Sequence, residues 1–163
     1  MTVPFDTARD IVTLATEKNL HISTAESCTG GMVAAAITDV PGSSSIFERG
    51  FVTYSNAAKV EMIGVSQSHL DKHGAVSEPV VRDMATGALH AARANIAVSI
   101  SGIAGPGGSE HKPEGRVCFG LAQGEQVTTE TVDFGALGRA KVRTAATQYA
   151  LDLILGALRQ GGT

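Results

Sequence analysis

The sequence predicts an α/β fold in which a mostly parallel sheet, with one antiparallel strand, lies between layers of helices. Over the first two thirds of the chain, segments with helical periodicity alternate with short aliphatic or β-branched segments, as in parallel strands joined by helices. Two strand-like segments close together near residue 125 are typical of a hairpin, which reverses one strand. Three loops, two of them containing glycines, each follow an expected strand.

Length and composition favour one globular domain spanning residues 1–163. Hydrophobic residues make up 43% of the chain and charged residues 18%, which excludes an intrinsically disordered protein. The formal net charge is −3 and the 13 Lys and Arg residues are scattered, so we expect no nucleic-acid partner. We find no secretory leader, no apolar run long enough to cross a membrane and only two, distant cysteines, so we expect a cytoplasmic protein without membrane contacts.

The first half of the chain contains two expected strands and three expected helices. Apolar residues recur every three to four positions over residues 7–19, which predicts a helix. A short strand is expected over residues 20–25, and after a polar turn residues 32–38 are apolar on nearly every face, as in a buried helix. Residues 50–54 have the β-branched and aromatic content of a strand, and a short helix over residues 56–59 follows it.

The second half begins with a helix over residues 78–92, whose first turn contains a proline. Residues 96–101 form a continuous run of small and aliphatic side chains, which favours a central strand covered on both faces. Residues 115–122 and 126–134 read as the two strands of the hairpin, and residues 137–158 as a closing helix with one apolar side.

The first of the three loops, residues 24–31, offers Ser27 as a nucleophile. A helix is expected to begin just after this loop, and the positive end of the helix could stabilise an anion or an oxyanion. Gly30 and Gly31 allow a substrate close to the backbone. The alternative is that Ser27 or Thr29 only caps this helix. Cys28 is a rival nucleophile that ranks behind Ser27, because a lone cysteine beside an apolar helix is more often a small buried residue.

The second loop supplies a candidate base. Lys59 lies one helical turn after an expected strand end, and a lysine with a desolvated amine can accept a proton from a serine hydroxyl. The alternative is an exposed lysine, the usual environment of this residue. Tyr54 could orient the base or donate to an oxyanion, or it could be an ordinary aromatic residue at a strand end.

The third loop contains four glycines within residues 102–108, which favours a nest of backbone N–H groups for a phosphate or carboxylate. The spacing matches neither the dinucleotide fingerprint nor the phosphate-binding loop of nucleotide hydrolases. His69 and His73 are four residues apart, but Gly74 follows them and no third ligand is near. We therefore expect solvated loop histidines and no metal site.

Four segments of the chain together resemble one known family, the C-terminal domain of the competence/damage-inducible protein CinA. They are Thr24-Ala25-Glu26-Ser27-Cys28-Thr29-Gly30-Gly31, Gly50-Phe51-Val52-Thr53-Tyr54-Ser55-Asn56 with Lys59, His73-Gly74-Ala75-Val76-Ser77-Glu78, and Ser99-Ile100-Ser101-Gly102-Ile103-Ala104-Gly105-Pro106. The resemblance covers nearly the whole chain. It implies a three-layer α/β/α sandwich without the pyrophosphatase-associated N-terminal domain of full-length CinA proteins.

The resemblance also implies an activity: hydrolysis of nicotinamide mononucleotide to nicotinate mononucleotide and ammonia, without a metal or another cofactor. It implies Ser27 as the nucleophile, Lys59 as its base and Tyr54 as a helper. Arg139 and Arg143, one helical turn apart, are candidates for the substrate phosphate, with an exposed helix face as the alternative. The substrate-binding residues expected in total are Thr29, Gly30, Gly31, Ser101, Gly102, Gly105, Arg139 and Arg143.

Two other functions stay open at this point. The same loops could hold a nucleotide without turning it over, as in a nucleotide-binding or competence-related interaction module, or they could serve an amidase for another small amide. If the protein is a deamidase, its expected partner is a small-molecule nucleotide substrate. Family members are often dimers, so a homodimer is a further expectation.

Overall fold

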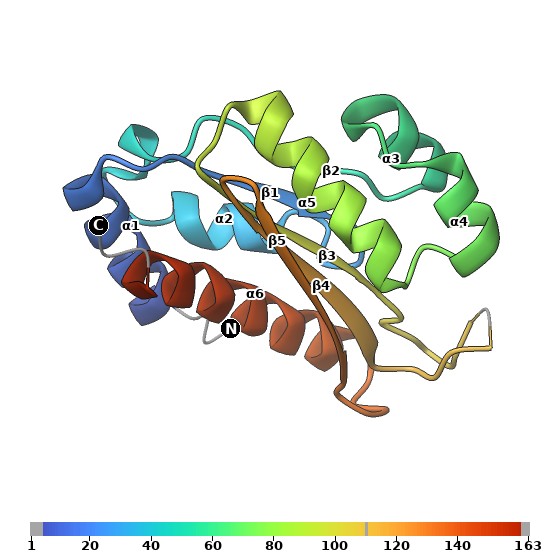
Figure 1. The fold of residues 1–163 in the computed structure, drawn as a ribbon. Helices are drawn as coiled ribbons and strands as arrows, with labels where there is room; N and C mark the ends of the chain where they lie inside the picture. The colour runs from blue at the N-terminus through green and yellow to red at the C-terminus, as the bar shows by residue number, and fades with distance from the viewer. Residues whose placement is uncertain (1–4, 110, 161–163) are drawn as a thin grey trace.

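The computed structural model describes residues 5–109 and 111–160, which form three layers with a five-stranded sheet in the middle (Figure 1). The strand order is β2-β1-β3-β4-β5. β1 pairs in parallel with β2 and β3, whereas β4 runs antiparallel to both of its neighbours, so it is the one reversed strand and the predicted mostly parallel sheet is confirmed. The strands are β1 (Ile22–Glu26), β2 (Phe51–Val52), β3 (Ile96–Gly102), β4 (Arg116–Gln123) and β5 (Gln126–Asp133).

Helices cover both faces of this sheet, as expected for an α/β/α sandwich. One face carries α1 (Phe5–Lys18), α2 (Met32–Thr38) and α6 (Arg139–Gln160), and the other carries α3 (Asn56–Ile63), α4 (Gln67–His73) and α5 (Glu78–Ala92). Each face has its own apolar cluster, one built around α6 and the other around α5. No helix within the described residues combines the length and apolarity that crossing a bilayer requires.

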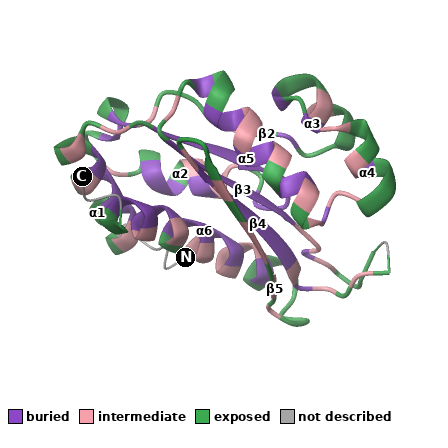
Figure 2. Cartoon of the chain, viewed as in Figure 1, coloured by how far each residue is buried: buried purple, intermediate pink, exposed green. Residues whose placement is uncertain are grey.

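The central strand β3 has helices on both faces, which confirms the prediction for residues 96–101. Every residue from Ile96 to Ser101 is buried (Figure 2). Ile96 and Val98 point into the cluster around α6, and Ala97 points into the cluster around α5, as the alternation of a strand requires. With both faces of this strand covered, a ligand is expected at its carboxyl end and the loop that follows.

Several boundaries differ from the sequence predictions. α3 continues to Ile63, one turn beyond the predicted end, and α6 begins at Arg139, because Gly138 has a positive φ of 93° that a helix does not accept. Residues 67–73, which were not predicted as a separate helix, form α4. Its start is fixed by Ser66, whose hydroxyl accepts a hydrogen bond from the His69 N–H.

Helices α3 and α5 pack unusually closely, at Gly87 of α5. A Cβ atom at Gly87 would lie only 1.9 Å from the carbonyl oxygen of Ile63, the last residue of α3. Ile63 is one helical turn after Lys59, so this contact holds the helix that carries Lys59 against α5.

Replacing Gly87 with alanine should therefore destabilise the protein, although alanine normally favours a helix over glycine. We expect the Gly87→Ala free energy of unfolding to fall by about 1–3 kcal/mol, because the new methyl group meets backbone that cannot move aside easily. Urea denaturation followed by circular dichroism measures this change.

The matched control is Gly156→Ala in α6, where a Cβ atom would meet nothing within 4 Å. This variant should keep the wild-type stability or gain up to about 1 kcal/mol from helix propensity. Equal stabilisation by both substitutions would contradict the close packing of α3 on α5.

Candidate active site

Three strands end at one edge of the sheet, and the segments after them carry the candidate residues. The backbone ladder continues past the strand ends: the Ser27 N–H donates to the Ile100 carbonyl at 2.9 Å, and the Thr53 N–H to the Glu26 carbonyl at 2.9 Å. Because the register pairs Glu26 with Ile100, the next pair across β1 and β3 is Ser27 and Ser101. The loops predicted from the sequence to bind a ligand therefore lie along the same edge.

The structure brings Ser27 and Lys59 into contact. The Lys59 Nζ lies 3.1 Å from the Ser27 Oγ. Lys59 is only 1% exposed and Ser27 9% exposed, so both are shielded from water. α3 begins with Ser55, whose hydroxyl accepts the Ala58 N–H at 3.0 Å, and this cap fixes the turn that carries the lysine. The alternative of an exposed Lys59 is therefore wrong.

Two further contacts of the Lys59 amine suit a proton acceptor. Nζ also donates to the carbonyl oxygens of Thr53, at 3.0 Å, and Tyr54, at 3.4 Å. A neutral amine has two N–H bonds and one lone pair. If the two carbonyls accept the two N–H groups, the lone pair is left for the third neighbour, the hydroxyl of Ser27, which can act as the donor. The arrangement can thus orient the amine toward the Ser27 proton.

The turn after Ser27 is organised by a buried carboxylate, that of Glu26. Its Oε1 accepts hydrogen bonds from the Thr29 hydroxyl at 2.6 Å and the Val33 N–H at 3.0 Å, and its Oε2 accepts one from the Ala34 N–H at 3.0 Å. Glu26 is fully buried and occupies the N-terminus of α2. Sequence reasoning missed this role, although an acidic residue shortly before a helix start was a usable signal.

The interpretation of Ser27 or Thr29 as the helix cap is consequently wrong. α2 begins at Met32, its N-cap position is Gly31, and no side chain there caps it; Glu26 supplies the acceptors instead. The expectation that the positive end of α2 faces an oxyanion is also wrong, because the Glu26 carboxylate already occupies this end of the helix. Ser27 keeps a hydroxyl that serves Lys59 and not the helix.

Cys28 is not the nucleophile in this geometry. It is buried in the apolar cluster around α6, and this burial raises the pKa of its thiol to about 11. The thiol therefore stays protonated near neutral pH, and the thiolate is the reactive form of cysteine.

Arg143 supports the same turn from α6. Its Nε donates to the Cys28 carbonyl at 3.0 Å and its second guanidinium nitrogen to the Thr29 carbonyl at 3.4 Å. Gly30 has a positive φ of 58°, and a Cβ atom there would lie 3.2 Å from this guanidinium. The glycine thus allows the arginine close to the backbone, and the alternative that Arg143 belongs to an unused helix face is wrong.

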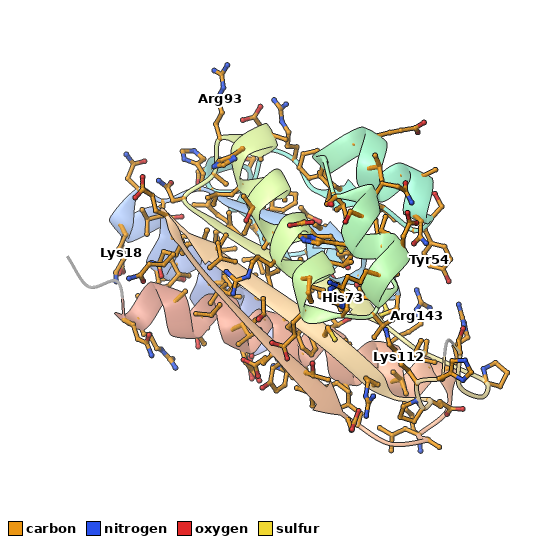
Figure 3. All side chains as sticks on the ribbon, turned by 45° about the vertical axis from the view of Figure 1, so that its right-hand side comes forward. Lys18, Tyr54, His73, Arg93, Lys112 and Arg143 are labelled. Carbon is orange, nitrogen blue, oxygen red and sulfur yellow. The ribbon has the colours of Figure 1, made fainter. Side chains whose placement is uncertain are left out.

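Arg139 connects the second and third loops. It donates to the Tyr54 hydroxyl at 2.8 Å and to the Gly105 carbonyl at 2.7 Å. The Tyr54 side chain is 58% exposed, so its ring lies at the rim while its backbone carbonyl contacts Lys59. Figure 3 shows Tyr54 and Arg143 at the same end of the molecule.

Close packing explains two glycines of the third loop, Gly102 and Gly105. A Cβ atom at Gly102 would lie 2.6 Å from the Val117 side chain, and one at Gly105 would lie 2.6 Å from the Glu114 carboxyl. The Glu114 carboxylate also accepts the Gly107 N–H at 2.7 Å. An internal carboxylate therefore already fills part of the predicted anion nest.

The histidines contribute to packing between helices. His69 is not a solvated loop residue as expected; it lies in α4, and its Nδ1 is 2.7 Å from an Asp83 carboxylate oxygen on α5. His73 ends α4 with its ring centre 6.3 Å from that of His69. No group of three or more potential metal ligands occurs among the residues that the structure describes.

Comparisons with known proteins agree with this architecture over nearly the whole chain. A family model described as the CinA C-terminal domain matches residues 5–158. A protein of Escherichia coli (strain K12) named Nicotinamide-nucleotide amidohydrolase PncC is 61% identical over 136 residues, 82% of this chain and 81% of that protein.

Solved structures are similarly close. The competence/damage inducible protein CihA from Agrobacterium tumefaciens matches with a TM-score of 0.92 at 44% identity, covering 98% of this chain and 99% of that one. The competence damage-inducible protein A (ComA) from Klebsiella pneumoniae subsp. pneumoniae MGH 78578 matches with a TM-score of 0.93 at 33% identity, covering 97% and 98%.

Replacing Glu26 with glutamine tests the proposed organisation of the turn. The amide has one acceptor oxygen in place of two, and its NH₂ group would face N–H donors, so we expect the free energy of unfolding to fall by about 2–4 kcal/mol. The same change at the exposed Glu17 of α1 should stay within about 0.5 kcal/mol of wild type. Urea denaturation of both variants measures this, and equal stabilities would contradict the capping role of Glu26.

Proposed function

The chain belongs to the CinA C-terminal domain family, and we propose on this basis that it is a nicotinamide mononucleotide deamidase with a serine nucleophile and a lysine base. The 61% identity to a nicotinamide-nucleotide amidohydrolase supports the reaction and its substrate. One structural observation supports the chemistry above all others: the buried Lys59 Nζ lies 3.1 Å from the Ser27 Oγ.

The reaction proceeds in two halves. The neutral Lys59 amine takes the Ser27 proton as Oγ attacks the carboxamide carbon, which forms a C–O bond and an oxyanion. When the intermediate collapses, the C–N bond breaks and the Lys59 ammonium returns the proton to the leaving nitrogen, which departs as ammonia. Water then attacks the acyl-enzyme with Lys59 as base again, so the products are nicotinate mononucleotide and a free Ser27 hydroxyl.

The backbone at the start of the Cys28–Gly31 turn assists this step in the proposed mechanism. The Cys28 N–H follows the nucleophile directly and is the backbone donor that best suits the oxyanion. Tyr54 contributes through its carbonyl, which helps to hold the Lys59 amine, and its exposed ring at the rim offers an apolar surface to the substrate.

The substrate phosphate is placed near Arg139 in this proposal. Arg139 is exposed at the N-terminus of α6, where a phosphate gains from both the guanidinium and the helix dipole. The second candidate, Arg143, is less exposed than Arg139 and holds two carbonyl groups of the nucleophile turn in place.

The proposed location is the cytoplasm, where a nicotinamide nucleotide would be met. Cys28 and Cys118 are both buried free thiols, which is compatible with a reducing compartment. The homodimer expected from the resemblance stays a prediction.

Substitutions of the two reacting residues test the proposal directly. Ser27→Ala should lower ammonia release from nicotinamide mononucleotide by about 10⁴-fold or more, and Lys59→Met by about 10²- to 10⁴-fold. Ammonia is measured on purified protein without added metal, and circular dichroism checks that both variants fold.

The controls separate this proposal from its alternatives. Wild-type protein that binds the nucleotide but releases no ammonia would identify a binding module, and release from other small amides alone would identify a different amidase. Full activity of Ser27→Ala would exclude the proposed nucleophile.

The role of Arg139 can be tested by comparing two substrates. Arg139→Ala should lower kcat/KM for nicotinamide mononucleotide by about 10- to 100-fold, because a charge-assisted hydrogen bond to phosphate is lost. The residual activity on nicotinamide riboside, which lacks the phosphate, should not change. Arg82→Ala is the matched control, since Arg82 bonds only to the Val127 carbonyl on β5; equal losses on both substrates would refute a phosphate contact.

A further inference from the structure

Ser101 carries a hydroxyl that the fold itself does not use. The residue is 1% exposed, and no hydrogen bond links its Oγ to any residue that the structure describes. Buried hydroxyl groups normally have a partner, because an unmade hydrogen bond costs free energy. Among the described residues, Thr53 Oγ1 is the one polar side-chain atom that is both fully enclosed and without a hydrogen-bond partner. The Ser101 Oγ also has no partner, so it is not fully enclosed and keeps a small accessible area.

This hydroxyl lies beside the nucleophile. Ser101 faces Ser27 across the parallel pair of β1 and β3, because the preceding pair is Glu26 with Ile100. Side chains in register point to the same face of a sheet and have neighbouring Cβ atoms. Ser99, two residues earlier on the same face, uses its hydroxyl differently: it donates to the Val81 carbonyl of α5 at 2.6 Å.

Several backbone donors near the nucleophile are already used by the fold. Formation of the oxyanion is most favourable when several donors point at it. The N–H groups of Gly31, Val33 and Ala34 are already bonded to the Glu26 carboxylate. The Gly30 N–H is bonded to the Ser27 carbonyl. These four donors are therefore occupied before a substrate arrives.

The position of Lys59 determines which end of the carboxamide faces Ser101. Lys59 reaches Ser27 from the β2 side, where its amine is held by the carbonyls of Thr53 and Tyr54. The leaving nitrogen must face this amine to receive its proton. The carboxamide oxygen then lies on the opposite flank of Ser27, which is the β3 side that carries Ser101.

We propose that the Ser101 hydroxyl donates a hydrogen bond to the carboxamide oxygen and stabilises the oxyanion together with the Cys28 N–H. This inference rests on the proposed deamidase activity and specifies one part of its site. No bond to Ser101 forms or breaks, and its proton stays on Oγ throughout. Because acylation and deacylation both pass through an oxyanion, Ser101 contributes to whichever half is slower.

The first experiment compares Ser101→Ala with Ser99→Ala, the same substitution two residues earlier on the same strand face. Ser101→Ala should lower kcat for nicotinamide mononucleotide by about 10²- to 10³-fold with little change in KM. Its melting temperature should equal that of wild type, since the hydroxyl has no partner to lose. Ser99→Ala should show the reverse pattern, a lower melting temperature with wild-type kcat, because it breaks the bond to Val81.

A second experiment tests whether the Ser101 hydroxyl acts on the carboxamide oxygen of the substrate. Thionicotinamide mononucleotide has sulfur, a weak hydrogen-bond acceptor, in place of the carboxamide oxygen. Wild-type enzyme should prefer the oxygen substrate, and Ser101→Ala should lose most of this preference, because the removed hydroxyl acted on the oxygen. Ser99→Ala should keep the wild-type preference, and Ser101→Thr, which retains a hydroxyl, should recover part of kcat.

The outcomes separate this inference from the proposed function. Wild-type protein that releases no ammonia from nicotinamide mononucleotide would remove the proposed function and this inference with it. An active wild type with an equally active Ser101→Ala, or a Ser101→Ala that loses the oxygen and sulfur substrates by the same factor, would overturn the inference alone.

Discussion

The burial of the Lys59 amine at the ends of β1 and β2 is the constraint on which the rest of the site depends. A lysine almost never lies inside a protein unless its nitrogen has partners, and here they include the two carbonyls after β2 and the Ser27 hydroxyl. The helix that carries this amine, α3, also packs closely on α5, at the glycine contact of Gly87 with Ile63. In the proposed mechanism, helix packing would thus contribute to the geometry of the proton transfer.

The buried Glu26 carboxylate imposes a second constraint. By occupying the N-terminus of α2 it makes the nucleophile turn rigid, because four donors converge on one side chain. The same bonds remove these donors from the substrate. In the proposed mechanism this turn keeps the Cys28 N–H for the oxyanion, and a second donor has to come from outside the turn, which is why an unpartnered hydroxyl on the neighbouring strand matters.

Much of this arrangement could be predicted from the sequence. Periodicity and composition predicted the strands and all the long helices of the three-layer fold, though not α4, and the loops at the strand ends offered Ser27 and Lys59 as candidates. The tertiary contacts could not be predicted: the acidic residue before α2 was a usable local signal, but nothing in the sequence shows that Glu26 is fully buried or that Arg139 bonds to a tyrosine hydroxyl 85 positions earlier. The pairing of His69 with Asp83 likewise depends on how α4 folds back onto α5. Periodicity reports which face of an element is buried, but not which polar group meets another.

Burial differs across the proposed site, between the groups assigned to the chemical step and those assigned to substrate binding. Ser27, Lys59 and Ser101 are enclosed at the strand ends, whereas Tyr54 and Arg139 are exposed at the rim. Enclosed polar groups act strongly on developing charge because little water screens them, and exposed groups contact the parts of a substrate that do not react. A change at the rim can therefore alter which amide is accepted while the serine and the amine keep their geometry. The bond between Arg139 and Tyr54 links the two zones, since the Tyr54 carbonyl also holds the lysine.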